Sequence, residues 1–372
     1  MSLTQVQSGM LQTTAQYYGF KNRIINGGMV IDQRANGGST SVQTSTTYAT
    51  CDRWQTFAST NSAFSIQQNA GSVTPPANFT NYLGCTTASS SYSIGAGDYF
   101  GFRQGIEGYN IADWNWGTAN AQSVTLSFWA RSSLTGTFGG VVKNQASTRS
   151  YPFTYSISSA NTWTYITVTI PGDTTTPASN WPTNNTNGVW IQWGLGVGST
   201  YSGAAGSWSA NNYISATGAI SVVGTANAYL YVTGVQIEVG AQATSFDYRP
   251  YGTELQLCQR YYYQLPPWNS ANLPICTTYQ RSSTIAIGAM LFPVTMRGIP
   301  SINVNSGTAY FHVSVGAGDF DALTVGVEGG TYINKNGVSL TTTFASGSST
   351  VGYAGELYLN AAGSILGFSA EL

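Results

Sequence analysis

Apolar and polar residues alternate along most of the chain, and this period of two predicts β-strands with one face packed on a core. In the clearest run, residues 189–197, alternate positions carry the apolar residues Val189, Ile191, Trp193, Leu195 and Val197 on one face, while Gln192, Gly194 and Gly196 lie on the other. We therefore expect a half-buried strand there. Three further runs predict strands: Val124–Arg131, Trp163–Ile170 and Tyr229–Val239, the last with a bulge at Gly234, where the apolar set changes face.

Clusters of Gly, Ser, Thr, Asn and Pro separate these runs, which is typical of turns and loops. Many short strands joined by such loops predict an all-β fold, either a sandwich or a barrel. The alternation returns near the C-terminus and predicts a second, smaller β domain over residues 268–372. Its expected strands are Ser283–Val294, Ile302–Val304, Phe311–Val315, Leu323–Val327, Gly355–Leu359 and Ile365–Phe368.

One helix is expected, in a connector over residues 253–267. The stretch Thr253–Gln256 has the pattern of a capping box, in which the threonine hydroxyl satisfies an unpaired backbone amide. Leu255, Cys258 and Tyr262 then fall on one helical stripe. Pro266 and Pro267 are expected to end the helix, because proline cannot donate a helical hydrogen bond.

Composition narrows the class of protein. The 372 residues include only 13 Lys and Arg and 14 Asp and Glu, with 42% hydrophobic residues, so the chain is expected to fold rather than to be disordered. A net charge of -1 argues against a nucleic-acid partner. Residues 1–20 are rich in Thr and Gln and do not resemble a secretory signal, and no apolar run predicts membrane insertion. The length favours two domains.

The four cysteines, Cys51, Cys85, Cys258 and Cys276, stand singly, and the chain has one histidine. Neither a zinc site nor a disulfide scaffold is indicated. We expect buried thiols in a protein made in a reducing cytoplasm.

Residues that could support catalysis are few. His312 is expected at the surface or at an interface, because it alternates with apolar neighbours in Phe311–Val315. Asp319 and Asp321 could ligate a cation or form a glycosidase pair, although alternation at a loop edge also explains their spacing. Asp52 and Glu107 each lie near an arginine and are interpreted as structural ion pairs. We expect no enzyme and no cofactor.

Aromatic rings in polar loops are the remaining candidates for ligand binding. Trp114, Trp116 and Tyr109 share one loop, and Trp181 lies in another. An exposed ring beside Asn and Gln suits a sugar, whose C–H face is apolar and whose hydroxyls need hydrogen-bond partners. The alternative is that these rings are core residues or loop anchors.

Several ordered motifs resemble those of a phage tail-fibre and receptor-binding protein family. The chain has an N-G-x-M-x-I-x-Q-R pattern within Asn22–Arg34 and a D-R-W pattern at Asp52–Trp54. Cys51 departs from the apolar residue expected before D-R-W. Further agreement, over about residues 20 to 265, comes from Gln104–Glu107, Asp113–Thr118, Val124–Trp129, Trp163–Gly172, Val235–Gly240, Phe246–Tyr251 and Leu257–Tyr262.

The resemblance implies a jelly-roll β-sandwich of the carbohydrate-binding-module type over residues 21–252, in a virion protein that contacts its host. The segment Phe292–Arg297 is similar to the β tips that end such fibres, usually as trimers. Arg34, Asp52, Arg53 and Trp54 are interpreted as fold determinants.

These observations predict a non-enzymatic tail fibre, trimeric and assembled in the host cytoplasm. Residues 1–20, with Leu3, Val6 and Met10 on one apolar face, would attach it to a phage tail or baseplate protein. The C-terminal domain would contact a host surface glycan, and avidity would strengthen weak single sites. The alternatives are a structural head, collar or decoration protein without receptor binding and, from another class, a glycan depolymerase.

Overall fold

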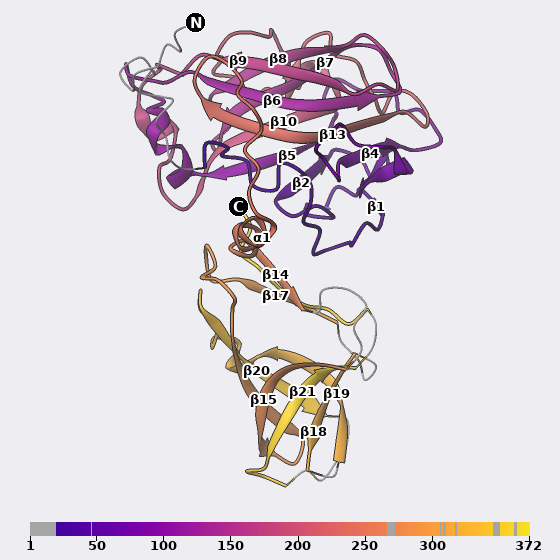
Figure 1. Cartoon of the computed structure of the whole chain (residues 1–372), viewed down its shortest axis with the longest axis vertical. Coiled ribbons are helices and arrows are strands. Elements are labelled where there is room, and N and C mark those ends of the chain that lie inside the picture. Colours follow the sequence, from indigo (N-terminus) through magenta and orange to yellow (C-terminus); the bar gives the residue numbers. More distant parts are fainter. Residues whose placement is uncertain are drawn as a thin grey trace, which may run out of the picture. The chain divides into compact units, whose positions relative to one another are not determined.

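The computed structural model describes residues 20–372 except 46, 266–271, 306, 308–309, 317, 345–349 and 361–362. The chain divides into two compact units, Met1–Pro250 and Tyr251–Leu372, each built mainly from strands (Figure 1). The predicted all-β fold, a sandwich followed by a smaller β domain, is therefore confirmed. The expected attachment face at Leu3, Val6 and Met10 and the helix-ending prolines Pro266 and Pro267 lie outside the described residues.

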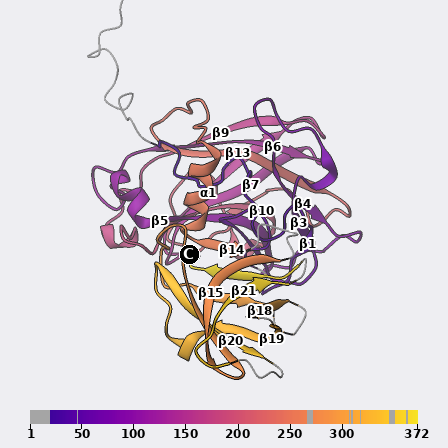
Figure 2. The ribbon, with the colours of Figure 1, turned by 60° about the horizontal axis from the view of Figure 1, so that its bottom comes forward.

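Two antiparallel sheets form the first unit (Figures 1 and 2). The six-stranded sheet has the order β1 (Thr40–Ser41), β3 (Phe64–Gln68), β4 (Leu83–Thr87), β13 (Tyr229–Val239), β6 (Val124–Ser132), β9 (Thr164–Ile170). The five-stranded sheet has the order β2 (Trp54–Ala58), β5 (Tyr99–Glu107), β10 (Asn187–Val197), β7 (Gly136–Asn144), β8 (Ser150–Ile157). Short elements in the connections are β11 (Ser202–Gly203), β12 (Ser215–Ala216) and the 3₁₀ turns η3 (Ala70–Ser72), η4 (Gly108–Trp114), η5 (Ala178–Asn180) and η6 (Ser199–Tyr201).

Aromatic packing joins the two sheets. Trp193 of β10 stacks on Phe102 of β5, with ring centroids 5.3 Å apart, and Phe128 of β6 meets Trp193 edge-on from the other sheet at 5.4 Å. All three residues are buried. Aromatic pairs in these geometries stabilise a core beyond the effect of the apolar area that they bury.

Strand β10 is buried on both faces, so the expectation of a half-buried strand is wrong. Gln192, on the face predicted to be polar, is 1% exposed, and Trp190 on the same face is 8% exposed. The bulge predicted in β13 is confirmed. Its pairing with β6 shifts register between Thr233 and Gln236, and Gly234 has a φ of 61°.

Residues 22–31, which precede β1, are mostly buried and belong to no sheet. Side-chain amides bond their backbone: the Asn26 amide donates to Ile31 O at 2.7 Å and to Asp52 O at 3.0 Å, and Asn26 Oδ1 accepts from Ile31 N at 3.0 Å. Trp54 Nε1 donates to Asn26 O at 3.1 Å. Buried backbone groups outside regular structure need such partners.

The motif residues interpreted as fold determinants have structural partners. Asp52, Arg53 and Trp54 are at most 1% exposed. Arg34 lies 3.6 Å from Asp52, and Arg53 donates to Gly105 O at 2.8 Å. These residues therefore hold the first unit together, as the sequence indicated.

The second unit begins with helix α1 (Tyr251–Gln259), which is shorter than predicted and starts two residues before Thr253. Tyr262 does not continue the helical stripe. It lies in strand β14 (Tyr262–Leu265), which pairs with β22 (Leu366–Ser369), and β22 pairs with β17 (Ser301–Val304). Consecutive tyrosines suit a paired strand better than a helix, since aromatic residues favour the pleated surface.

A closed barrel completes the second unit. Its strand order is β15 (Leu273–Ser282), β16 (Ile285–Leu291), β20 (Gly337–Phe344), β19 (Gly318–Val327), β18 (Phe311–Val315), β21 (Ala354–Leu359), with the 3₁₀ turn η7 (Glu328–Gly330) following β19. Leu340, Leu357 and Phe311 are among its buried core residues. Closure leaves no unpaired sheet edge.

The cysteines, all within the described residues, form no disulfide. Cys51, Cys85 and Cys258 are buried, as expected, whereas Cys276 is half-buried. Burial raises the pKa of the Cys276 thiol to about 11, and the nearby Glu356 carboxylate adds to this effect. No helix in the described part of the chain has the length and the apolar run that a membrane crossing requires.

The amide of Asn26 supplies a direct test of the buried network. Asn26→Ala should lower the free energy of unfolding by about 3 kcal/mol, because three buried backbone groups lose their partner and Ala is strained at a φ of 57°. Urea denaturation measures this loss. Exposed Asn227 has the same φ, so Asn227→Ala measures the strain alone, about 1 kcal/mol. Equal losses in the two variants would contradict the role of the network.

Candidate functional site

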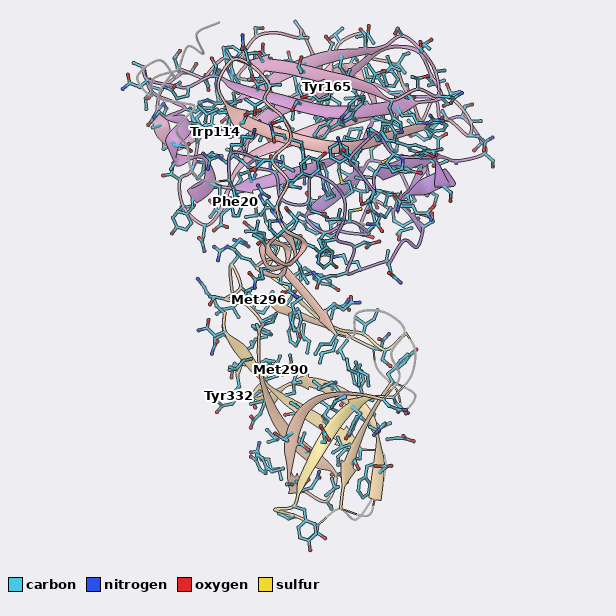
Figure 3. The ribbon with its side chains drawn as sticks, viewed as in Figure 1. Phe20, Trp114, Tyr165, Met290, Met296 and Tyr332 are labelled. Atoms are coloured by element: carbon cyan, nitrogen blue, oxygen red, sulfur yellow. The ribbon has the colours of Figure 1, made fainter. Side chains whose placement is uncertain are left out.

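The loop tryptophans expected to be exposed are buried. Trp114, Trp116 and Trp181 are 0%, 3% and 2% exposed. Figure 3 labels Trp114 among the side chains of the first unit. The Trp116 ring centroid lies 4.8 Å from that of Trp114, 4.7 Å from that of Trp181 and 5.2 Å from that of Trp208. The expectation of exposed rings is wrong for these three residues, and the alternative, that they anchor loops, describes them.

Asp173 connects this tryptophan cluster to its surroundings. Trp181 Nε1 donates to Asp173 Oδ2 at 3.1 Å, and Arg149 donates to both carboxylate oxygens at 2.8 and 2.7 Å. Burial alone would raise the pKa of Asp173, but hydrogen bonds from Arg149 and Thr175 outweigh it and lower that pKa below its usual value. The cluster is a structural anchor, because the Asp173 carboxylate accepts hydrogen bonds both from the Trp181 ring and from Arg149.

Tyr109 is the remaining candidate from the loops. It lies in η4 and is 61% exposed, so its ring can meet a ligand. Its role in binding stays a prediction.

His312, Asp319 and Asp321 lie on strands of the barrel. His312 is half-buried, stacks on Tyr358 with ring centroids 5.0 Å apart, and pairs in register with Asp321. Both aspartates are exposed. Among the described residues, no group of three or more His, Cys, Asp or Glu side chains is placed to hold a metal ion.

Charged and amide side chains gather instead on the face of the five-stranded sheet that points away from the sandwich core, called here the outer face. In one row across the strands, Gln55 of β2 pairs with Arg103 of β5, Arg103 with Gln192 of β10, and Gln192 with Val141 of β7. In the next row on the same face, Trp190 lies between Gly105 and Lys143. Residues two apart on a strand share a face, so these side chains are neighbours.

Arg103 is held by two rings. Its guanidinium carbon lies 3.9 Å from the ring centroid of Trp190 and 5.6 Å from that of Phe57, and its Nε donates to Gln55 Oε1. Gly105 makes room for this arrangement, because a Cβ there would lie 2.8 Å from the Trp190 ring. Among the described residues, none accepts a hydrogen bond from the terminal guanidinium nitrogens. Stacking fixes the orientation of the guanidinium and leaves its fork of donors available.

Lys143 is buried beside this arginine. It is 5% exposed, and its Nζ donates to Oδ1 of exposed Asn212 at 2.9 Å. Burial lowers the pKa of the Lys143 ammonium to about 8, and the Arg103 guanidinium contributes to the shift. Burial also lowers the pKa of Arg103, to about 10. The ion pairs of the described chain do not include either residue.

Two amides beside these cations have unused hydrogen-bonding groups. Gln192 Oε1 is buried and has no partner among the described residues, and the same holds for both polar atoms of the Asn187 amide. The side chains of Asn187 and Trp190 both lie over Gly105. A Cβ on Gly105 would lie 2.5 Å from Asn187 Oδ1. Unpartnered buried polar groups are rare in folded proteins and often mark functional positions.

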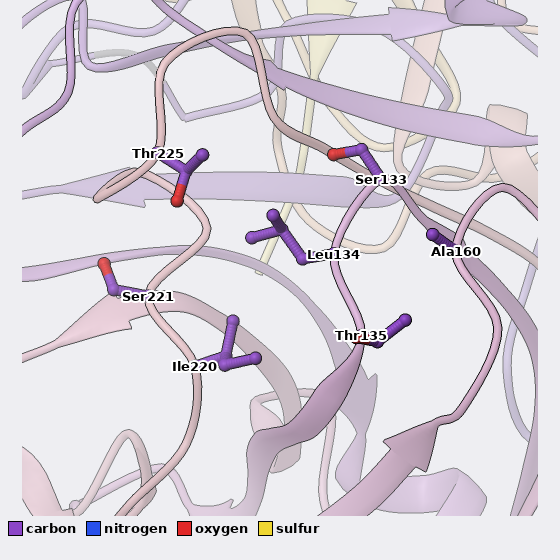
Figure 4. A pocket seen from close by; sticks show the side chains of 7 residues that line it. All are labelled: Ser133, Leu134, Thr135, Ala160, Ile220, Ser221 and Thr225. Carbon is purple, nitrogen blue, oxygen red and sulfur yellow. The ribbon is translucent and has the colours of Figure 1, made fainter.

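A separate pocket of about 360 Å³ opens in the first unit (Figure 4). It is lined by small hydroxyl and aliphatic residues: Ser133, Leu134, Thr135, Ala160, Ile220, Ser221 and Thr225. Two of its hydroxyls already accept backbone hydrogen bonds, Ser133 from Tyr229 N and Ser221 from Gly224 N. This lining has no charge and no ring to orient a ligand, so the outer face is the stronger candidate site.

Sequence reasoning missed Arg103 and Lys143. A signal was present: Lys143 is one of three lysines in the chain and follows Val141 and Val142 in a strand. A cation in such a strand is unexpected unless a ligand or a carboxylate meets it.

Comparison with known proteins gives likenesses of low identity. No family model and no curated protein matches the sequence. Among solved structures, the chain is similar to the enzymatically active domain of bacteriophage CBA120 tailspike protein 4, at 12% identity and a TM-score of 0.31, over 59% of this chain and 22% of that chain. It is also similar to TmCBM61 in complex with β-1,4-galactotriose, at 10% identity and a TM-score of 0.31, over 59% of this chain and 99% of that chain.

A third similar structure is the family 11 carbohydrate-binding module from Clostridium thermocellum in complex with a β-1,3-1,4-mixed-linked tetrasaccharide. The identity is 11% and the TM-score 0.25, over 55% of this chain and 98% of that chain.

Trp181→Ala should destabilise the first unit by about 3 to 5 kcal/mol, because it opens a cavity in the tryptophan cluster and removes a donor from Asp173. Thermal denaturation measures the loss. Trp129→Ala is the matched control. Trp129 is half-buried and packs on Tyr165, so its removal should cost about 1 to 2 kcal/mol. A Trp181 variant as stable as the parent would mean that its ring is not an anchor.

Lys143→Met should raise the free energy of unfolding by about 2 kcal/mol at pH 7, since it removes a buried cation at the loss of one hydrogen bond. The folded-state pKa of Lys143 is lowered, so the destabilisation is fully present below about pH 8 and fades toward pH 10.5. Chemical denaturation at pH 7 and pH 10 should therefore show the advantage of the variant shrinking with pH. A variant less stable than the parent at pH 7 would make Lys143 a structural residue.

Proposed function

We propose that the chain is a non-enzymatic receptor-binding or tail-fibre protein of a phage virion that attaches to glycans on the host surface. The outer face of the five-stranded sheet is the proposed glycan site. The phage assignment rests on the ordered sequence motifs between residues 20 and 265, whose Asp52 and Trp54 are buried and bonded in the first unit.

One observation carries the binding function: Arg103 is stacked between Phe57 and Trp190, next to the unpartnered oxygen of buried Gln192. Rigid side chains with unused donors and acceptors suit polar ligands, because little ordering remains to be done on binding. Half-buried rings of Phe57 and Tyr99 lie nearby, with centroids 6.3 Å apart, and offer apolar surface for the C–H face of a sugar.

The sequence placed receptor contact in the C-terminal domain. The proposal places it in the first unit instead, because Arg103 and Lys143 lie there without an ion pair to any described residue. In this proposal the barrel serves assembly, since a chain with few charges can bury large surface between identical copies at little desolvation cost. Assembly as a homotrimer, attached to the phage tail or baseplate through residues 1–20, belongs to the proposal.

Binding to whole bacterial cells and to an array of bacterial surface glycans tests the function. Arg103→Ala should weaken binding at least tenfold, because it removes the stacked donor group. Tyr109→Ala, at the exposed loop ring, should stay within about twofold of the parent. The reverse result would move the site to the loop. Failure to bind any cell or glycan would favour a structural head, collar or decoration protein.

The native mass tests the assembly. Light scattering of the purified protein should give a mass near three times 39.4 kDa. A monomer would contradict a self-assembling fibre.

Release of reducing sugar from a bound glycan, lost in Asp319→Asn or Asp321→Asn, would establish the depolymerase instead.

A further inference from the structure

Two cations of the outer face, Arg103 and Lys143, differ from several other charged residues of the first unit. Two other arginines of the first unit form ion pairs, Arg149 with Asp173 at 2.7 Å and Arg34 with Asp52 at 3.6 Å. Arg103 and Lys143 are close enough to lower the pKa of the lysine, yet neither forms an ion pair with a described residue. Lys143 is buried and Arg103 is half-buried. A cation withdrawn from water without a paired anion destabilises the fold.

The hydrogen-bonding groups around these cations define the missing partner more closely. Arg103 offers the terminal nitrogens of its guanidinium, a fork that matches the two oxygens of a carboxylate. Lys143 donates to an exposed side chain, Asn212, whose oxygen an incoming anion can replace. Gln192 Oε1 needs the opposite, a donor. A simple anion has no donor, whereas a sugar acid carries a carboxylate together with hydroxyl groups.

We propose that the outer face recognises an acidic sugar, whose carboxylate binds Arg103 and Lys143 and whose hydroxyl donates to Gln192. This inference rests on the proposed function, because it names the class of glycan that the same site selects. The carboxylate takes the place of Asn212 Oδ1 at the Lys143 ammonium, and the C–H face of the sugar lies toward Phe57 and Tyr99. Specificity for the acidic unit follows from the uncompensated charge, since a neutral sugar leaves both cations unpaired.

The test measures binding of the full-length protein to matched pairs of glycans that differ in one charge. The probes are tetragalacturonate with its methyl ester, and sialyllactose with lactose, each titrated calorimetrically. At least one acidic member should bind tenfold or more tightly than its uncharged partner. Lys143→Met and Arg103→Gln should each weaken that binding tenfold or more, while Arg281→Gln, at an ion pair whose arginine is 60% exposed in the second unit, stays within twofold.

Loss of folding does not confuse the result, because Lys143→Met is expected to be more stable than the parent and circular dichroism checks each variant. Equal affinity for charged and uncharged members, unchanged by Lys143→Met, would overturn the inference and leave the proposed function standing. Binding of sulfated lactose without binding of either carboxylate would overturn it as well. Absence of binding to every neutral and acidic glycan of the array would contradict the proposed function, and the inference with it.

Discussion

The stability of the first unit depends on hydrogen bonds to a stretch of buried backbone that belongs to no sheet. Most of residues 22–31 are buried and none of them belongs to a sheet, so side chains must replace the missing strand partners. Asn26 bonds Ile31 and Asp52, and Gln104 donates to and accepts from the backbone of Ile25. Asparagine and glutamine can do this because each amide both donates and accepts. The same requirement explains why the recurring motifs of the chain are polar and yet buried.

Scarcity of charge gives each remaining charge a definite place. Arg149 and Asp173 tie the tryptophan cluster to its loops, and the Arg34–Asp52 pair supports the buried N-terminal segment. Lys143 has no carboxylate partner, and burial of its ammonium group therefore destabilises the fold. Arginine side chains that support the fold are therefore paired with carboxylates of the chain, whereas the cations of the candidate site are left without such a partner.

Periodicity predicted β6, β9, β10 and β13 of the first unit, because alternation follows directly from the geometry of a pleated backbone. The bulge at Gly234 was visible for the same reason. Periodicity named no strand at β5, β7 or β8. The sequence pattern did not show which positions become buried by contacts from distant parts of the chain. Gln192 has a polar strand position but is buried, and Trp181 lies in a polar loop but packs on rings that are distant in sequence. Tyr262 fitted a helical stripe until pairing with β22 decided its structure. Lys143 and Arg103 belong to one face only because β10 pairs with both of their strands, and no local pattern in the sequence records that pairing.

The two cations of the outer face also bear on how this protein changes over generations. They stand on strands whose opposite faces fill the core, so exchanging them leaves strand register intact. Selection for stability alone would favour apolar residues there, since these remove a buried and unpaired charge. Persistence of Lys143 and Arg103 among descendants would therefore report selection, and a lineage that no longer needed their ligand would be recognised by an apolar residue at position 143 in an otherwise unchanged fold.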